Sequence, residues 1–258
     1  MNNFNDDIKN KSKYSKKQNN IINPKLLKLL QKEETGFKNI SLWKHRNKKW
    51  VCNFIENGKE QIYRFEKFLD AYTYMYQKFY YKNKFMYSVL KNEDTELRYA
   101  GIEFDDIANG DGIGAVFFTQ YCPHHCTKCQ NPQTWSKDGG MKFTQNIFDN
   151  LMKYYNTVPF ANRLTLSGGD PLSNLNIINF ISAEFKRQYP NKQLWIYTGY
   201  KFEELNDTKY YPILELSDVI VDGMFKFEKR DITLRYRGSS NQRIFVKQEN
   251  GEWIDATT

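Results

Sequence analysis

The chain has 258 residues, with 38 Lys and Arg against 30 Asp and Glu, and a net charge of +8. That length allows one full-sized domain with its own hydrophobic core and a second, smaller one. The sequence contains no run of about 18 apolar residues, and residues 1–20 have no apolar stretch of the kind found in signal peptides. These features argue against a membrane-spanning or secreted protein and predict a cytoplasmic one.

The positive charge is concentrated in the first part of the chain. Residues 1–95 carry 20 Lys and Arg against 10 Asp and Glu, whereas residues 96–258 carry 18 against 20. Such an asymmetry is typical of a basic module, with a polyanion such as nucleic acid as partner, attached to a nearly neutral body. Residues 1–35 are predicted to be a basic, mostly disordered tail with one short helix, because they offer little apolar surface to offset the entropy of ordering.

Residues 36–84 are predicted to form a small basic module of three strands and a helix. Three short, alternating apolar runs precede an aromatic segment at helical spacing, and Asn57-Gly58 lies between the second and third runs as a hairpin turn. Cys52 is expected to be a buried strand residue, since a free cysteine behaves as a small apolar side chain. The polar segment 85–96 is interpreted as a linker.

From residue 97 to 258, strand-like runs alternate with helix-like ones. The expected strands are GAVFFTQ (114–120), RLTLSG (163–168), QLWIYTG (193–199), DVIVDG (218–223) and RIFVK (243–247). The expected helices between them cover residues 144–156, 174–189 and 201–216. This order predicts an α/β domain in which βα units surround a parallel sheet.

Three of the four cysteines lie in one CxxxCxxC segment, directly after the first of these strands: Cys122, Cys126 and Cys129. Parallel sheets place their sites at this carboxyl edge. Three thiolates can hold three irons of a [4Fe–4S] cluster and leave the fourth iron open for a substrate. The same segment also allows zinc, with His124 or His125 completing a Cys₃His tetrahedron. The cysteine spacing alone leaves both possibilities open.

A second motif, LTLSGGDPL at 164–172, supplies context for the cysteines. Gly168 and Gly169 follow a strand and let the backbone approach a ligand closely, and Asp170 adds a carboxylate. A turn of this kind is common by itself, but its position after the strand that follows the cysteines makes the combination specific. The glycine-rich segment 109–114 precedes its strand, unlike a dinucleotide-binding loop, and is interpreted as a turn near the mouth of the site.

These motifs resemble the radical S-adenosylmethionine (SAM) superfamily and, within it, the activating proteins of anaerobic ribonucleoside-triphosphate reductases. The resemblance extends from about Arg98 to Lys247 through the blocks RYAGIEFDDIANGDGIGAVFF, CQNPQTW, LTLSGGDPL, IYTGY, VDGMF and RGSSNQRIF. Two departures stand out: Met224 replaces an expected proline, and Asp170 replaces the Glu of much of the wider superfamily.

The resemblance implies that residues 97–258 form an incomplete (βα) radical-SAM barrel that holds a [4Fe–4S] cluster on Cys122, Cys126 and Cys129. Gly168, Gly169 and Asp170 would bind SAM, with Asp170 at its amino group. One electron from the cluster would cleave SAM, and the resulting radical would take a hydrogen atom from a glycine of the reductase large subunit. A flavodoxin- or ferredoxin-like protein would supply the electron.

Further residues are candidates on position alone. Tyr197 and Thr198 end a strand on the side of the site and could approach SAM, although core packing would equally explain Tyr197. The segment 239–242 could contact the cofactor or the partner, or simply form a turn before the last strand.

Residues 36–82 resemble the APETALA-type DNA-binding modules. Basic and aromatic side chains on the predicted sheet could meet phosphates and base edges: Trp43, Lys44, Arg46, Lys48, Lys49, Trp50 and Arg64. A protein-docking or purely structural role is the alternative for this module. For the whole chain, the alternatives to the activating enzyme are a radical SAM enzyme with another target and a zinc-stabilised nucleic-acid-binding protein.

Overall fold

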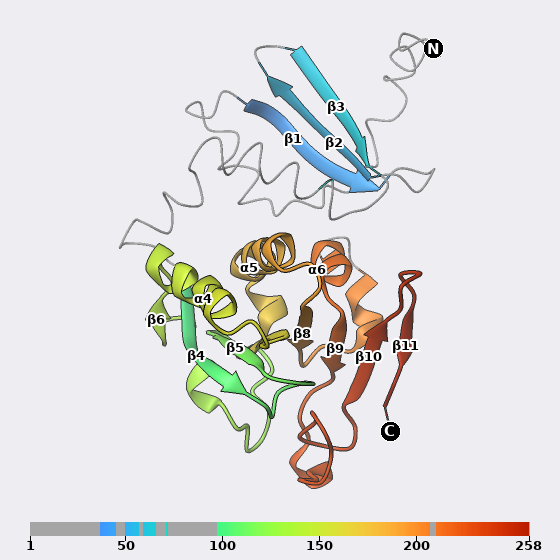
Figure 1. Cartoon of the computed structure of the whole chain (residues 1–258). Helices are drawn as coiled ribbons and strands as arrows, with labels where there is room; N and C mark the ends of the chain where they lie inside the picture. The colour runs from blue at the N-terminus through green and yellow to red at the C-terminus, as the bar shows by residue number, and fades with distance from the viewer. Residues whose placement is uncertain are drawn as a thin grey trace. The chain divides into compact units, whose positions relative to one another are not determined.

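The computed structural model describes residues 37–44, 50–56, 59–65, 71, 97–206 and 210–257. The chain divides into two compact units, Met1–Ala71 and Tyr72–Thr258. Each unit contains its own β-sheet (Figure 1). The two units are treated separately below.

The first unit contains a three-stranded antiparallel sheet in the order β1-β2-β3, made of β1 (Phe37–Lys44), β2 (Trp50–Glu56) and β3 (Lys59–Phe65). The three predicted strands are therefore confirmed. Cys52 is fully buried in β2, and burial raises the pKa of its thiol to about 12, as expected for a packing residue. The predicted hairpin turn and Arg46, Lys48 and Lys49 lie outside the described residues, as does the predicted helix apart from Ala71.

The second unit contains an eight-stranded mixed sheet in the order β11-β10-β9-β8-β7-β5-β4-β6. Its central four strands are parallel: β5 (Gly114–Thr119), β7 (Arg163–Gly168), β8 (Gln193–Tyr197) and β9 (Val219–Asp222). They coincide with four of the apolar runs predicted as strands. Every residue of β5, β7 and β9 is buried or half-buried, as is typical of the central strands of a parallel sheet.

Antiparallel strands flank this parallel centre, so the sheet expected from the sequence to be parallel is mixed. β10 (Arg243–Lys247) pairs antiparallel with β9, and β11 (Trp253–Asp255) pairs antiparallel with β10. A parallel partner requires a crossover connection, commonly a helix, and the chain between β9 and β10 contains only the short 3₁₀ turn at Phe227–Lys229 among its described residues. On the other side, β4 (Arg98–Asp106) pairs antiparallel with both β5 and β6 (Met141–Lys142).

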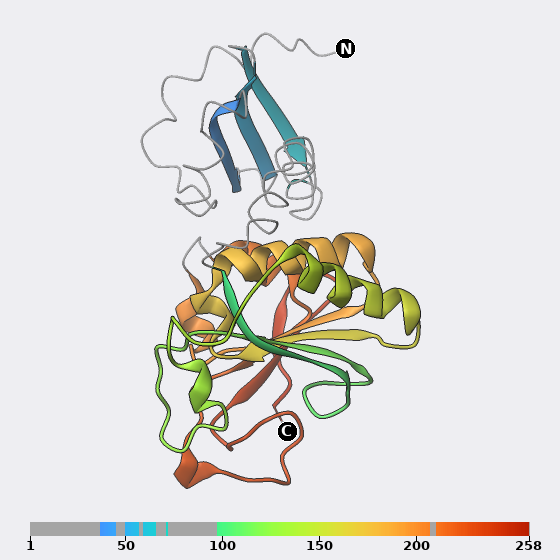
Figure 2. The same cartoon turned by 90° about the vertical axis from the view of Figure 1, so that its left-hand side faces the viewer.

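Three helices cover one face of the sheet: α4 (Gln145–Thr157), α5 (Leu175–Gln188) and α6 (Tyr211–Leu216) (Figures 1 and 2). The first two match the predicted helices closely. The continuous helix predicted over 201–216 is wrong, because a 3₁₀ turn at Phe202–Asn206 precedes a separate α6 that begins beside Pro212. Proline lacks the N–H that a continuing helix needs and fits only its first turn.

Aromatic side chains make up much of the core of the second unit. Phe117 on β5 stacks on Tyr99 of β4 with ring centroids 5.6 Å apart, and Phe143 meets Phe117 edge-on at 5.3 Å. On the helical side, Tyr155 of α4 contacts Phe185 of α5, and its hydroxyl donates to the Arg163 carbonyl at 2.7 Å. Among the described residues, no helix has the length and apolar character needed to cross a membrane.

Candidate active site

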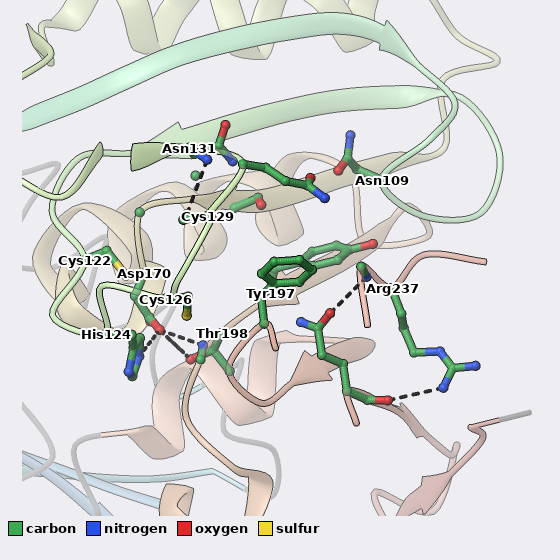
Figure 3. A pocket seen from close by; sticks show the side chains of 18 of the residues that line it. Asn109, Cys122, His124, Cys126, Cys129, Asn131, Asp170, Tyr197, Thr198 and Arg237 are labelled. Carbon is green, nitrogen blue, oxygen red and sulfur yellow. Dashed lines mark hydrogen bonds and ion pairs between the residues drawn. The ribbon is translucent and has the colours of Figure 1, made fainter. Parts of the chain in front are cut away.

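A pocket of about 350 Å³ lies at the carboxyl ends of the four parallel strands (Figure 3). That volume is within the range of small-molecule sites, about 300–1,000 Å³. Its walls come from the segments that follow β5, β7, β8 and β9, as expected for a parallel sheet. Every predicted site residue lines it: Cys122, Cys126, Cys129, Gly168, Gly169, Asp170, Tyr197 and Thr198.

The cysteine loop, residues 121–131, winds around its three cysteines in an unusual backbone conformation. Tyr121, His125 and Lys128 each immediately precede a cysteine, and they have positive φ values of 79°, 48° and 54°. A left-handed backbone is uncommon outside glycine and costs on the order of 1–3 kcal/mol per residue, so it persists where the surroundings enforce it. The repeated reversals bring all three cysteine side chains onto the wall of one pocket.

Two of the three thiols, those of Cys122 and Cys126, lie in an environment that favours their neutral form. Burial is the main cause that raises the pKa of Cys122 to about 11, and the nearby Asp170 carboxylate adds to it. Burial and the adjacent Cys129 also raise the pKa of Cys126. A thiolate set in such a place needs positive charge to stabilise it, which iron ions would supply. The Sγ atom of Cys129 already accepts a hydrogen bond from the Asn131 N–H at 3.3 Å.

The two histidines of the cysteine loop have other partners. His124 Nε2 lies 2.7 Å from Asp170 Oδ2, and the His125 ring stacks on Trp135 with centroids 4.7 Å apart. Within the described part of the chain, no three His, Cys, Asp or Glu side chains converge on a single metal ion. Both histidines that could complete a Cys₃His zinc site thus have contacts elsewhere in the described structure.

Backbone hydrogen bonds join the Gly168-Gly169-Asp170 turn to the cysteine loop and to the end of β5. The Gly169 N–H donates to the Thr119 carbonyl at 2.8 Å, and the Asp170 N–H donates to the Tyr121 carbonyl at 2.9 Å. Gly168 has a φ of +95°, and a Cβ there would lie 2.7 Å from the Phe118 Cα, so no other residue fits without movement. The two motifs singled out in the sequence therefore form one structural unit.

The Asp170 side chain joins three parts of the site. It is 1% exposed, and its two oxygens accept hydrogen bonds from Leu172 N, Thr198 Oγ1 and Gly199 N at 2.8–3.1 Å, besides their contact with His124. Figure 3 shows His124 and Thr198 on either side of this carboxylate. Because a carboxylate offers about four lone-pair positions, protein groups already use most of its capacity.

The Tyr197 hydroxyl, in contrast, is buried and has no hydrogen-bond partner among the described residues. Burial raises its pKa above the usual value, so the hydroxyl stays protonated at neutral pH. The ring packs against the cluster formed by Trp195, Val219 and Val221, yet the residue also lines the pocket. The same side chain thus packs against the core and lines the pocket.

A buried ionic network that no sequence motif indicated supports the wall of the pocket. Arg163 is fully buried and donates to Asp106 Oδ1 at 2.8 Å, to the Asp106 carbonyl at 2.7 Å and to the Asn109 carbonyl at 3.0 Å. Thr165 Oγ1 also donates to the Asn109 carbonyl at 2.8 Å. These bonds fix the glycine-rich segment so that Ala108 and Asn109 form part of the pocket wall, as predicted for a turn near its mouth.

The segment between β9 and β10 supplies a further wall. Part of this wall lies in the blocks VDGMF and RGSSNQRIF, whereas no motif indicated Leu234 and Tyr236. Phe225, Leu234, Tyr236, Arg237 and Gly238 line the pocket, and the Tyr236 hydroxyl donates to Asp111 Oδ1 at 3.2 Å. Of the candidate segment 239–242, Gln242 alone lines the pocket; Ser239, Ser240 and Asn241 do not. Residues as far apart in the chain as Ala108 and Gln242 thus share one cavity, which periodicity cannot reveal.

Comparison with known proteins also indicates an iron–sulfur protein. A family model described as a 4Fe-4S single cluster domain matches residues 108–245, and anaerobic ribonucleoside-triphosphate reductase-activating proteins match 54–57% of the chain. The one from Vibrio cholerae is 37% identical over 142 residues, which cover 91% of its length. Those from Escherichia coli K12 and from Enterobacteria phage T4 are 36% and 38% identical, and each is covered over 92% of its length.

The chain belongs to the family of anaerobic ribonucleoside-triphosphate reductase-activating proteins. The resemblance drawn from the sequence motifs is thereby confirmed, and with it a [4Fe–4S] cluster and SAM as cofactors. For this activating-protein family, a wall with three cysteines, an adjoining Gly-Gly-Asp turn and an unpaired tyrosine hydroxyl in one pocket is a chemically suitable site. The matched family region begins after the first compact unit, so about the first hundred residues are additional to it.

Proposed function

We propose that this protein reductively cleaves SAM and installs a glycyl radical on the large subunit of an anaerobic ribonucleoside-triphosphate reductase. The observation that carries the proposal is that one pocket contains the three cysteines of CxxxCxxC and the Gly-Gly-Asp turn in a chain of the activating-protein family. We also propose that the mixed sheet is an incomplete radical-SAM barrel and that the protein is cytoplasmic.

Cys122, Cys126 and Cys129 would hold three irons of the cluster, which leaves the fourth iron for the amino and carboxylate groups of SAM. When bound, the cluster supplies one electron to SAM, whose C–S bond breaks to give methionine and a 5′-deoxyadenosyl radical that takes a hydrogen atom from a glycine Cα of the reductase. A flavodoxin- or ferredoxin-like protein would return one electron per cleavage.

The other residues of the pocket would bind, orient and shield SAM. Gly168 and Gly169 let the turn pack directly against the backbone at Phe118 and Tyr121, which places it beside the cysteine loop. Asp170 adds its negative charge there and holds Thr198 and Gly199 in position. The Tyr197 hydroxyl can complete its hydrogen bonding with a polar group of the cofactor. Phe118, Phe225 and Leu234 add apolar walls that keep water from the radical.

The experiment is anaerobic activation of the partner reductase. Reduced, reconstituted protein and SAM should produce the doublet of a glycyl radical in the electron paramagnetic resonance spectrum of the large subunit. SAM cleavage without any reductase radical would instead favour a radical enzyme with another target, and a protein that binds zinc and no iron would refute the proposal altogether.

The first unit has a proposed role of its own in binding DNA. Its antiparallel sheet exposes Lys59 and Arg64 on β3, and the charge of residues 1–95 is strongly positive. Lys and Arg contacts to phosphate release counterions, so binding should weaken steeply as salt increases. Duplex DNA that binds no better to the full chain than to residues 96–258 would refute this role.

A further inference from the structure

We infer that residues 224–238 form the docking surface for the segment of the reductase that carries the radical-bearing glycine, and that this segment is apolar and acidic. The inference rests on the proposed function, which requires a glycine Cα of another protein to reach this pocket. It adds which surface receives that protein and which chemistry the surface selects.

The position of residues 224–238 supports the inference. Their inward side chains, among them Phe225, Leu234 and Tyr236, are walls of the pocket, so their outer side forms part of its rim. The segment extends beyond the ends of β9 and β10, on the side of the sheet away from α4, α5 and α6 (Figures 1 and 2). A partner that presents a glycine to the pocket must pass this rim.

The outer side of residues 224–238 exposes several apolar side chains to solvent. Ile232 is 80% exposed, and Met224 and Phe227 are each 40% exposed, all within nine residues. Single exposed apolar residues are common on any protein, but several in one short segment beside a pocket are typical of an interaction surface. Burying Ile232 against a partner would recover hydrophobic free energy that the free protein lacks.

The positive charge of residues 224–238 indicates that the partner segment is acidic. Residues 224–238 contain five Lys and Arg against two Asp and Glu, although residues 96–258 as a whole contain slightly more acidic than basic residues. Lys226, Lys229, Arg230 and Arg235 are exposed. A local positive patch on a slightly negative body attracts and orients an acidic segment.

The surface is also held in place before any partner binds. Gln242 Oε1 accepts hydrogen bonds from the Gly238 and Ser239 N–H groups at 2.9 and 3.1 Å, and Asn241 Nδ2 donates to the Met224 carbonyl at 2.9 Å. Lys128 of the cysteine loop places its Nζ atom 3.8 Å above the Phe227 ring. A preformed surface loses less conformational entropy on association, so it binds more tightly for the same contacts.

The test uses the full-length holoenzyme and the reductase large subunit. Ile232→Asp should weaken binding to the reductase at least tenfold and reduce the glycyl-radical yield, while dithionite-driven SAM cleavage without the reductase stays at the wild-type rate. Ile254→Asp, on β11 and 48% exposed, is the matched control and should bind and activate like wild type. Lys229→Glu combined with Arg230→Glu should weaken binding and reduce its salt dependence.

Two results would overturn the inference. One is an Ile232→Asp protein that binds and activates the reductase like wild type, and the other is a change in the protein's own oligomeric state, which would make this surface a contact between two copies. Failure of the wild-type protein to produce any glycyl radical would instead be a failure of the proposed function, so the two are distinguishable.

Discussion

Replacing Asp170 by asparagine removes the charge at the centre of the site and preserves its shape. The wild-type carboxylate is 1% exposed and faces donors on Leu172, Thr198 and Gly199 as well as the His124 ring. An asparagine amide must direct its own N–H₂ at one of these donors. The proposed bond between Asp170 and the SAM amino group would also lose its charge assistance. Hydrogen bonds to a charged group contribute about 1.5–3 kcal/mol, so loss of this one should lower SAM affinity about 10- to 150-fold.

The assay is calorimetric titration of SAM into the anaerobically reconstituted variant, with iron content measured on the same sample. The iron content should stay at the wild-type level, because Asp170 is not proposed as an iron ligand. Asp149→Asn, at an exposed position on α4, is the matched control and should bind SAM like wild type. The double variant His124→Gln/Asp170→Asn should lose less affinity than the sum of the single losses, since both changes remove the same contact. Wild-type SAM affinity in Asp170→Asn would refute the role of this carboxylate.

Four further predictions follow from the site and the fold. Alanine at any one of the three cysteines of the cysteine loop should abolish the cluster, whereas Cys52→Ala should retain about four irons per chain; a full cluster in any loop variant would contradict the ligand assignment. Tyr197→Phe should leave thermal stability unchanged or raised, because its hydroxyl has no partner, but should weaken SAM binding about two- to tenfold; equal affinity by calorimetry would exclude a bond to the cofactor. Arg163→Met should destabilise the fold by about 3–5 kcal/mol, because Asp106 would be left as an unpaired buried charge, and denaturant unfolding of Arg163→Met/Asp106→Leu should recover part of that loss. A chain that begins at Glu96 should still cleave SAM but lose salt-dependent binding to duplex DNA, as measured by fluorescence anisotropy; DNA binding that survives the truncation would contradict the role of the basic module.

The sequence was sufficient to predict the parts of this fold that depend on local pattern. The four central strands are short runs rich in apolar residues and bounded by turn residues, and α4 and α5 have clear helical spacing. β4 was not predicted as a strand, because its second half is exposed and its apolar residues do not form one run. The direction of β10 was predicted wrongly, because an isolated strand sequence does not encode whether its partner runs parallel or antiparallel.

In the site, too, short motifs could be predicted from the sequence, whereas residues whose role depends on distant partners could not. The cysteines and the Gly-Gly-Asp turn are short motifs that are recognisable wherever they fold. In contrast, Arg163 reads as an ordinary strand residue, and its role depends on Asp106, which lies 57 positions away. The positive φ values at Tyr121 and His125 are also invisible in sequence, because bulky residues seldom adopt that conformation and do so here under tertiary constraint.

Deuterium transfer from the target glycine tests the central claim most directly. Reductase large subunit labelled with deuterium at its glycine Cα positions would be incubated with the reduced protein and SAM, and the 5′-deoxyadenosine product analysed by mass spectrometry. We predict one deuterium per 5′-deoxyadenosine, formed together with the glycyl radical in the reductase. Product that contains no deuterium, at a yield equal to that without the reductase, would contradict hydrogen abstraction from this partner.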